Sequence, residues 1–162
     1  HVLAIKDRES PFYEKVKHAG VKESKSRPIA YNSLYSIVSI FSESALPVQS
    51  DPTELAELVK RSFQIVKETW PDAWEKKPSE SRLVHGAGLR AMAMLLVNKL
   101  EALAQNGTNA HRSPETWQAI RESMTRLKAL VIWTDAEIHT ATKNAQKFYK
   151  EEIMSVQNTV QD

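Results

Sequence analysis

The sequence of 162 residues contains no cysteine, only four glycines and only seven prolines. Without cysteine the chain cannot form disulfides, thiolate metal sites or thiol nucleophiles, and this composition fits a reducing compartment. We therefore expect a cytoplasmic location. The scarcity of glycine and proline argues against a β-sandwich or barrel, because such folds need many tight turns.

Long apolar runs and a strong charge of one sign are also missing. No apolar stretch approaches the roughly 20 residues of a transmembrane helix, so we expect no membrane association. The formal net charge of +2 gives no strong overall attraction to nucleic acid. The chain begins with His1 and Val2 and reads like the interior of a longer sequence, so we expect it to be a fragment.

The periodicity of apolar residues predicts an all-α fold, an irregular bundle of four to six helices over residues 31–162. Residues 1–30 are irregular and basic, and we expect them to continue from an N-terminal domain outside this sequence. Asn32 is the expected N-cap of the first helix. Asp51 is a stronger start signal, because Pro52 follows it and Glu54 can reach back as in a capping box.

The later elements are predicted from similar signals. Pro71 is expected to end the second helix, and residues 74–78 to form a connector. A central helix is predicted over Arg82–Gln105 and another after Ser113, and a last helix from about Thr134. The expected core residues share these apolar stripes: Leu55, Val59, Phe63, Val66, Leu95, Leu96, Trp117, Met124 and Leu127.

The most distinctive local motif is His85-Gly86-Ala87-Gly88. Two glycines near a helix start could let backbone N–H groups approach a phosphate, with Arg90 adding charge. A phosphate loop would also need a preceding strand with G-x-G-x-x-G spacing, or a G-K-[ST] ending, and neither is present. We therefore favour the interpretation that Gly86 and Gly88 allow close helix packing.

The histidines, serines and tryptophans give weaker evidence for a functional site. The histidines at positions 18, 85, 111 and 139 show no H-x-x-x-H or H-E-x-x-H spacing, so solvated or packed side chains are favoured over a metal site. We expect neither a metal nor a cofactor. No G-x-S-x-G element supports a hydrolytic triad. The tryptophans Trp70, Trp117 and Trp133 lie on or beside apolar stripes and are expected in the core, rather than as platforms for bases. Trp74 is expected to fold back as a lid.

A basic segment precedes the first helix. Its cations are not interleaved with aromatic residues, so it reads mostly as a solvated loop, although cations on a mobile arm suffice to contact DNA phosphate. The candidate DNA-binding residues are Lys15, Lys17, Lys22, Lys25 and Arg27, with Arg90 as a further candidate.

Three stretches together resemble a known family. Residues 7–16, DRESPFYEKV, are similar to a D-x-x-S-P-F-x-x-x-(I/V) element, and residues 63–74, FQIVKETWPDAW, to F-x-x-(I/V)-K-E-x-(W/F)-P-x-A-W. Residues 84–92, VHGAGLRAM, then resemble an x-T-x-G-x-x-A-L helix. In this order the stretches resemble the C-terminal helical part of the DGQHR-domain family. That family includes DndB-like regulators of bacterial DNA phosphorothioation.

The resemblance spans residues 7–100. It implies a non-catalytic module that takes part in regulating DNA modification by binding DNA or partner proteins. The namesake D-G-Q-H-R motif is absent from this sequence, so no functional residue is carried over. His85-Gly86 also replaces the threonine-rich approach of the family helix. The alternative is a protein–protein or oligomerisation module without nucleic-acid contact, whose apolar patch is expected around Phe148, Tyr149 and Ile153.

Overall fold

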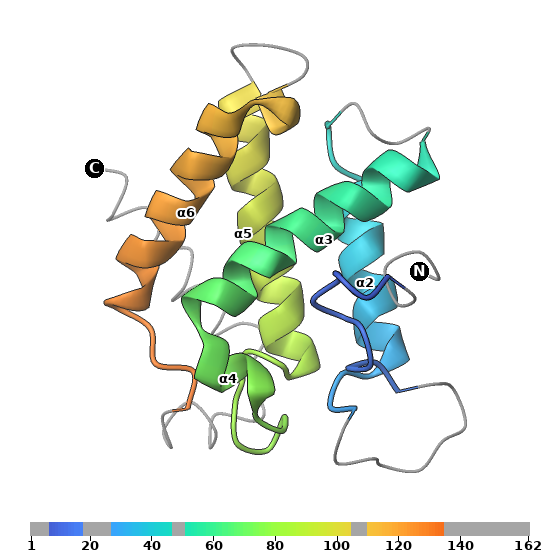
Figure 1. The fold of residues 1–162 in the computed structure, drawn as a ribbon, viewed down its shortest axis with the longest axis vertical. Coiled ribbons are helices and arrows are strands. Elements are labelled where there is room, and N and C mark those ends of the chain that lie inside the picture. Colours follow the sequence, from blue (N-terminus) through green and yellow to red (C-terminus); the bar gives the residue numbers. More distant parts are fainter. Residues whose placement is uncertain (1–6, 18–26, 47–50, 105–109, 135–162) are drawn as a thin grey trace.

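The computed structural model describes residues 7–17, 27–46, 51–104 and 110–134. Within these ranges five α-helices pack together and no strand forms, which confirms the predicted all-α class. The elements are α2 (Tyr31–Ser42), α3 (Pro52–Thr69), α4 (Pro71–Glu75), α5 (Gly86–Ala104), the 3₁₀ helix η1 (Ala110–Arg112) and α6 (Pro114–Lys128). Helix α3 crosses in front of α2 and α5, and α6 lies on the other side of α5 from α2 (Figure 1). The helix predicted after Thr134 lies outside the described residues.

Helix α2 begins before its predicted cap. Ala30 is the N-cap, and its carbonyl oxygen accepts hydrogen bonds from the N–H groups of Ser33 (3.0 Å) and Leu34 (3.3 Å). No side chain caps this helix, so the prediction of Asn32 as N-cap is wrong. Ile29 is buried, and its backbone forms hydrogen bonds with Lys15 and Lys17. The extended segment therefore ends at Ile29, directly before Ala30.

Helix α3 confirms one half of the predicted capping box and corrects the other. The Asp51 carboxylate accepts hydrogen bonds from the N–H groups of Thr53 (2.9 Å) and Glu54 (3.2 Å), and Pro52 occupies the first turn. The Glu54 side chain does not reach back. Its Oε1 accepts hydrogen bonds from Arg112 and His111, and a guanidinium is a stronger partner for a carboxylate than a backbone N–H group.

Pro71 both ends α3 and begins α4. The predicted connector over residues 74–78 is therefore partly wrong, because residues 71–75 form a short helix. Proline is compatible with the first helical position, since its missing N–H would have no partner there. The carbonyl oxygen of Trp70 accepts from the N–H of Trp74 at 3.0 Å, which turns Trp74 back into the bundle.

The central helix α5 begins at Gly86, four residues later than predicted. Residues 82–85 are instead held by tertiary contacts, because the N–H of Arg82 donates to the carbonyl oxygen of Trp133 at 3.0 Å. In the following helix, Ser113 is the N-cap of α6 by position, but its side chain makes no capping hydrogen bond.

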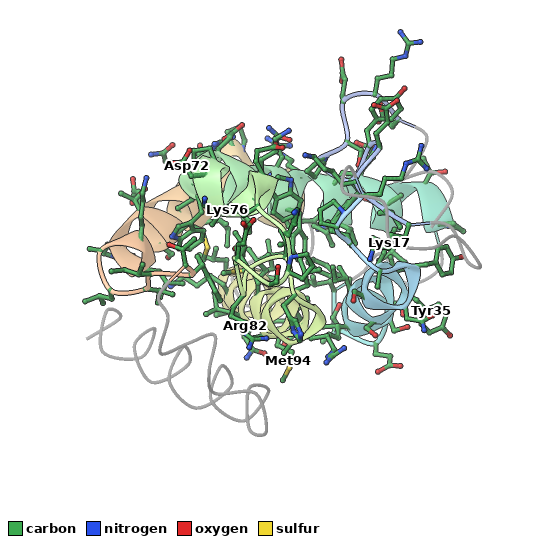
Figure 2. The ribbon with its side chains drawn as sticks, turned by 90° about the horizontal axis from the view of Figure 1, so that it is seen from below. Lys17, Tyr35, Asp72, Lys76, Arg82 and Met94 are labelled. Atoms are coloured by element: carbon green, nitrogen blue, oxygen red, sulfur yellow. The ribbon has the colours of Figure 1, made fainter. Side chains whose placement is uncertain are left out.

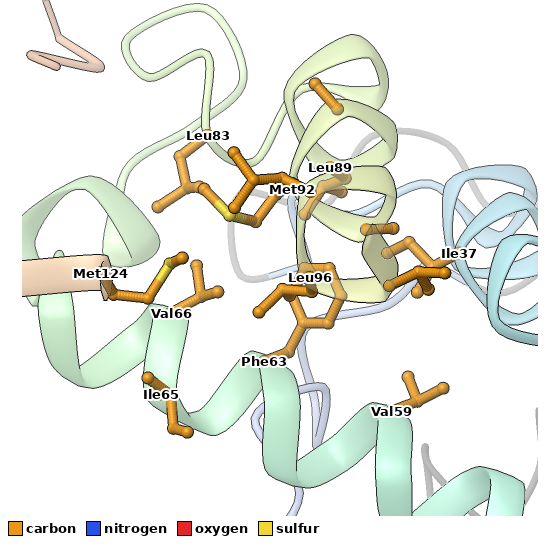
Figure 3. Packing of buried hydrophobic residues seen from close by; sticks show 14 of the residues in the cluster. Ile37, Val59, Phe63, Ile65, Val66, Leu83, Leu89, Met92, Leu96 and Met124 are labelled. Carbon is orange, nitrogen blue, oxygen red and sulfur yellow. The ribbon is translucent and has the colours of Figure 1, made fainter. Parts of the chain in front are cut away.

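The core lies between α2, α3, α5 and α6 (Figure 3). Eight of the nine predicted core residues are buried, and Leu55 is the exception, since it is only partly buried in the first turn of α3. The N-terminal segment contributes to the same core. Phe12 is fully buried, and its ring centroid lies 5.3 Å from that of Phe63 and 5.9 Å from that of Trp74. Residues 7–17 thus contain no helix yet pack as part of the bundle.

Candidate functional site

The predicted basic residues lie in different surroundings. Lys15 forms an ion pair with Glu75. The segments that hold Lys17 and Arg27 lie side by side, because the N–H of Lys17 donates to the carbonyl oxygen of Ile29 at 2.8 Å, two residues beyond Arg27. Lys22 and Lys25 lie outside the described residues.

Arg90 belongs to the same end of the bundle as Lys17 and Arg27. A Cβ atom built on Gly86 would lie 3.0 Å from the Ser33 hydroxyl and 3.4 Å from the Arg90 guanidinium, so the first turns of α5 and α2 are adjacent. Both helices begin at this end (Figure 1). Figure 2 views the bundle from below, with Lys17 beside α2 and Arg82 beside α5. The aligned N-termini add partial positive charge to the cationic side chains.

The His85-Gly86-Ala87-Gly88 motif has a local structural role. The Nδ1 atom of His85 accepts a hydrogen bond from the N–H of Ala87 at 3.2 Å, so the imidazole caps α5. A Cβ atom on Gly88 would lie 1.8 Å from the carbonyl oxygen of Arg82. This contact agrees with the packing interpretation, because the Gly88 position has no room for a side chain.

All four tryptophans are buried, with at most 6% of their surface exposed. The rings of Trp70 and Trp133 meet edge to face at 5.8 Å, and Trp74 is enclosed by Phe12 and Phe63. Trp74 is therefore a core residue of the bundle. None of these rings offers an open face like those on which nucleic-acid bases stack.

A feature that the sequence did not predict is a cleft of about 430 Å³ between α3, η1 and α6. This volume is in the range of small-molecule sites. We call it the α3–α6 cleft. Its lining residues are Asp51, Thr53, Glu54, Glu57, Leu58, Arg61, His111, Arg112 and Trp117.

One wall of the α3–α6 cleft is a hydrogen-bonded group around Glu54. Its Oε1 lies 2.9 Å from Nε of Arg112 and 3.1 Å from Nε2 of His111. The hydrogen bond from Arg112, followed by that from His111, lowers the pKa of the Glu54 carboxyl below its ordinary value. Ionised Glu54 can only accept, so the Nε2 atom of His111 carries the proton. The other ring nitrogen of His111 is buried and has no hydrogen-bond partner among the described residues.

The floor of the cleft combines an aromatic ring and a cation. The indole N–H of Trp117 donates to the carbonyl oxygen of His111 at 2.6 Å, which fixes the ring. The guanidinium carbon of Arg61 lies 4.7 Å from the centroid of this ring, a cation–π contact. Within the described residues, Arg61 has no carboxylate partner.

A second hollow of about 190 Å³ adjoins the cleft further along α3, and Arg61 and Glu57 line both. We call it the side hollow. Lys60 forms ion pairs here with Asp7 and Glu57, and the hydrogen bond from Lys60 lowers the pKa of Asp7. Arg121, on the opposite wall, pairs with Glu68.

The sequence could not predict this site because its partners are far apart along the chain. Glu54 and His111 are separated by 57 positions, and Arg61 and Trp117 lie on helices whose contact is set by the packing of α3 against α6. The only signal available was the apolar spacing that placed Trp117 on the buried face of its helix.

The described residues contain no group of three or more histidine, aspartate or glutamate side chains able to hold a metal ion. In the same part of the chain, every helix is too short or too polar to cross a lipid bilayer. Comparison of the chain with protein-family models, curated proteins and solved structures found no match. The resemblance to the DGQHR-domain family therefore stays a prediction that rests on the three sequence stretches.

Proposed function

We propose that this chain is a non-catalytic helical module of a DGQHR-type protein in the bacterial cytoplasm. In this proposal it takes part in bacterial DNA modification and its regulation, including phosphorothioation, by binding DNA or partner proteins of the modification system.

The observation that carries the proposal is that the three family-like stretches meet in one structural unit. Phe12 from the first stretch contacts Phe63 and Trp74 from the second. Leu89 and Met92 from the third stretch belong to the same buried hydrophobic cluster as these three residues. Burial of the three stretches in one core is compatible with their forming a single helical module.

The end of the bundle where α2 and α5 begin supports a DNA contact. Lys17, Arg27 and Arg90 lie there, beside two helix N-termini that favour anions. Lysine and arginine at such a surface neutralise backbone phosphates without reading the base sequence. Lys15 is expected to contribute less, because Glu75 already neutralises it.

The test is fluorescence anisotropy with a labelled DNA duplex over a series of salt concentrations. Phosphate contacts release counterions, so the logarithm of the affinity should fall linearly with the logarithm of salt, by about 0.9 per contact. The triple variant Lys17→Gln, Arg27→Gln, Arg90→Gln should bind more weakly and show a shallower slope.

Lys128→Gln is the matched control, because Lys128 is exposed at the end of α6, on the other side of α5 from α2. It should bind DNA as the unmodified chain does. Binding that is insensitive to salt, or unchanged in the triple variant, would contradict a DNA contact at this end.

The alternative function is a protein–protein or oligomerisation module without nucleic-acid contact. Its expected apolar patch around Phe148, Tyr149 and Ile153 lies outside the described residues. A monomer by light scattering at high concentration would argue against self-association. Dimerisation with flat DNA titrations would favour this alternative over the DNA-binding module.

A further inference from the structure

Arg61 stands out among the cations that line the α3–α6 cleft and the side hollow. Arg112 is paired with Glu54, Lys60 with Asp7 and Glu57, and Arg121 with Glu68. Arg61 also lines both spaces, yet within the described residues its guanidinium forms no ion pair and stacks on the face of Trp117. Its N–H donors therefore remain available at the junction of the two spaces.

Stacking prepares Arg61 for anion recognition. A guanidinium over an aromatic ring keeps its plane fixed, and its edge presents parallel N–H donors that match a carboxylate or a phosphate. The ring is itself held by the hydrogen bond from Trp117 to His111, and His111 is buried against Glu54. The donor thus lies on a rigid wall, so little side-chain entropy is lost when an anion binds.

The surrounding charges limit which anion can bind. Five carboxylates line the two spaces, from Asp7, Glu9, Asp51, Glu54 and Glu57. A DNA strand brings a dense row of phosphates, and these carboxylates would repel most of them. A single carboxylate with neutral or cationic neighbours meets less of that repulsion, because it adds only one negative charge next to Arg61. A polypeptide segment carries such isolated charges.

The combined size of the α3–α6 cleft and the side hollow favours a polypeptide segment over a small anion as the ligand. The cleft of about 430 Å³ and the hollow of about 190 Å³ share Arg61 and Glu57 and follow each other along α3. Together they extend beyond the size of one carboxylate. We propose that this surface docks a segment of a partner protein, whose aspartate or glutamate carboxylate is bound by Arg61.

This proposal does not depend on the DNA contact proposed above, because the two surfaces share no residue. A variant at Arg61 therefore tests the docking site alone. The triple variant at Lys17, Arg27 and Arg90 tests DNA binding alone.

The experiment is an NMR titration of the full chain that follows the indole N–H signals of the tryptophans. Trp117 reports on the site, and Trp70 and Trp74, in the core, are internal controls. The probes are the blocked tripeptides Gly-Asp-Gly and Gly-Asn-Gly, acetate, and a short oligothymidylate. We expect the aspartate peptide to shift the Trp117 signal with a dissociation constant of about 1–10 mM, as befits one ion pair in a small ligand.

The variant Arg61→Gln should weaken this binding by about tenfold or more, because it removes the charge-assisted hydrogen bonds. Lys128→Gln, which removes an exposed cation that lines neither the cleft nor the side hollow, should bind the aspartate peptide as before. The proposal is overturned if the asparagine peptide or acetate binds as tightly as the aspartate peptide. It is equally overturned if Arg61→Gln binds normally, if only oligothymidylate shifts Trp117, or if no probe does.

Discussion

A Cβ atom built on Gly88 would lie 1.8 Å from the carbonyl oxygen and 2.8 Å from the carbonyl carbon of Arg82. The obstacle is backbone, which cannot rotate away as a side chain would. Gly88→Ala must therefore push α5 away from residues 82–83. We expect it to lower the free energy of unfolding by about 1–3 kcal/mol, as overpacking of a core does. Urea denaturation followed by circular dichroism measures this loss.

Gly86→Ala is the control for that substitution. Its Cβ would meet the Ser33 hydroxyl at 3.0 Å, and this side-chain atom can move aside where backbone cannot. Gly86→Ala should therefore cost less than Gly88→Ala. If both variants have the stability of the unmodified chain, the close approach at Gly88 is not a packing constraint.

The Phe12 ring ties the N-terminal segment to the helices. Phe12 is fully buried between Phe63 and Trp74, so Phe12→Ala should lower the free energy of unfolding by about 3–5 kcal/mol, through lost burial and the cavity left behind. Tyr35→Ala is the comparison, since Tyr35 is 56% exposed on α2 and should change stability by less than about 0.5 kcal/mol. Equal effects in thermal denaturation would contradict the described packing of residues 7–17.

Helices α3 and α6 each begin with a polar residue followed by proline, Asp51-Pro52 and Ser113-Pro114. We expect the two polar residues to contribute differently to the free energy of unfolding. Asp51 accepts two backbone hydrogen bonds at the start of α3, so Asp51→Ala should cost about 1 kcal/mol. Ser113 occupies the same position before α6 but makes no capping hydrogen bond, so Ser113→Ala should cost clearly less. A larger loss for Ser113→Ala in urea denaturation would show that the capping roles are reversed.

The hydrogen-bonded group around Glu54 should make the free energy of unfolding depend on pH in the acidic range. Arg112 and His111 lower the pKa of Glu54 in the folded chain, so the folded state binds fewer protons than the unfolded state. The resulting stabilisation is present above the pKa of Glu54 in the unfolded chain and is lost as the pH falls through its lower pKa in the folded chain. Glu54→Gln should therefore reduce the rise in unfolding free energy between acidic and neutral pH.

A second variant keeps the Glu54 carboxyl and tests whether Arg112 is the cause of its lowered pKa. Arg112→Gln removes the first cause, so the Glu54 pKa should rise toward its ordinary value. Carbon-13 NMR of the Glu54 carboxyl measures this directly. A carboxyl that titrates at the same pH with and without the guanidinium would refute the assigned cause.

Local patterns in the sequence determined the helical class, most helix positions and the buried faces. The apolar spacing that selects Val59, Phe63 and Val66 on α3 needs no tertiary information, because a helix places these positions on one face. The Asp51-Pro52 start is equally local, since a cap acts within one turn. Asn32 failed as a cap because Ile29 is fixed by hydrogen bonds with Lys15 and Lys17, which are distant in the sequence.

Only the tertiary structure decided which of these residues meet. Packing of α3 against η1 and α6 brings Glu54 to His111 and Arg61 to Trp117, and creates the cleft between them. Packing of residues 82–83 against α5 delays that helix to Gly86 and requires glycine at position 88. The physical reason is the distance along the chain over which each effect acts. Helix periodicity and caps act within a few residues, whereas the charge pairs and the cleft form between segments that are fifty or more positions apart in the sequence.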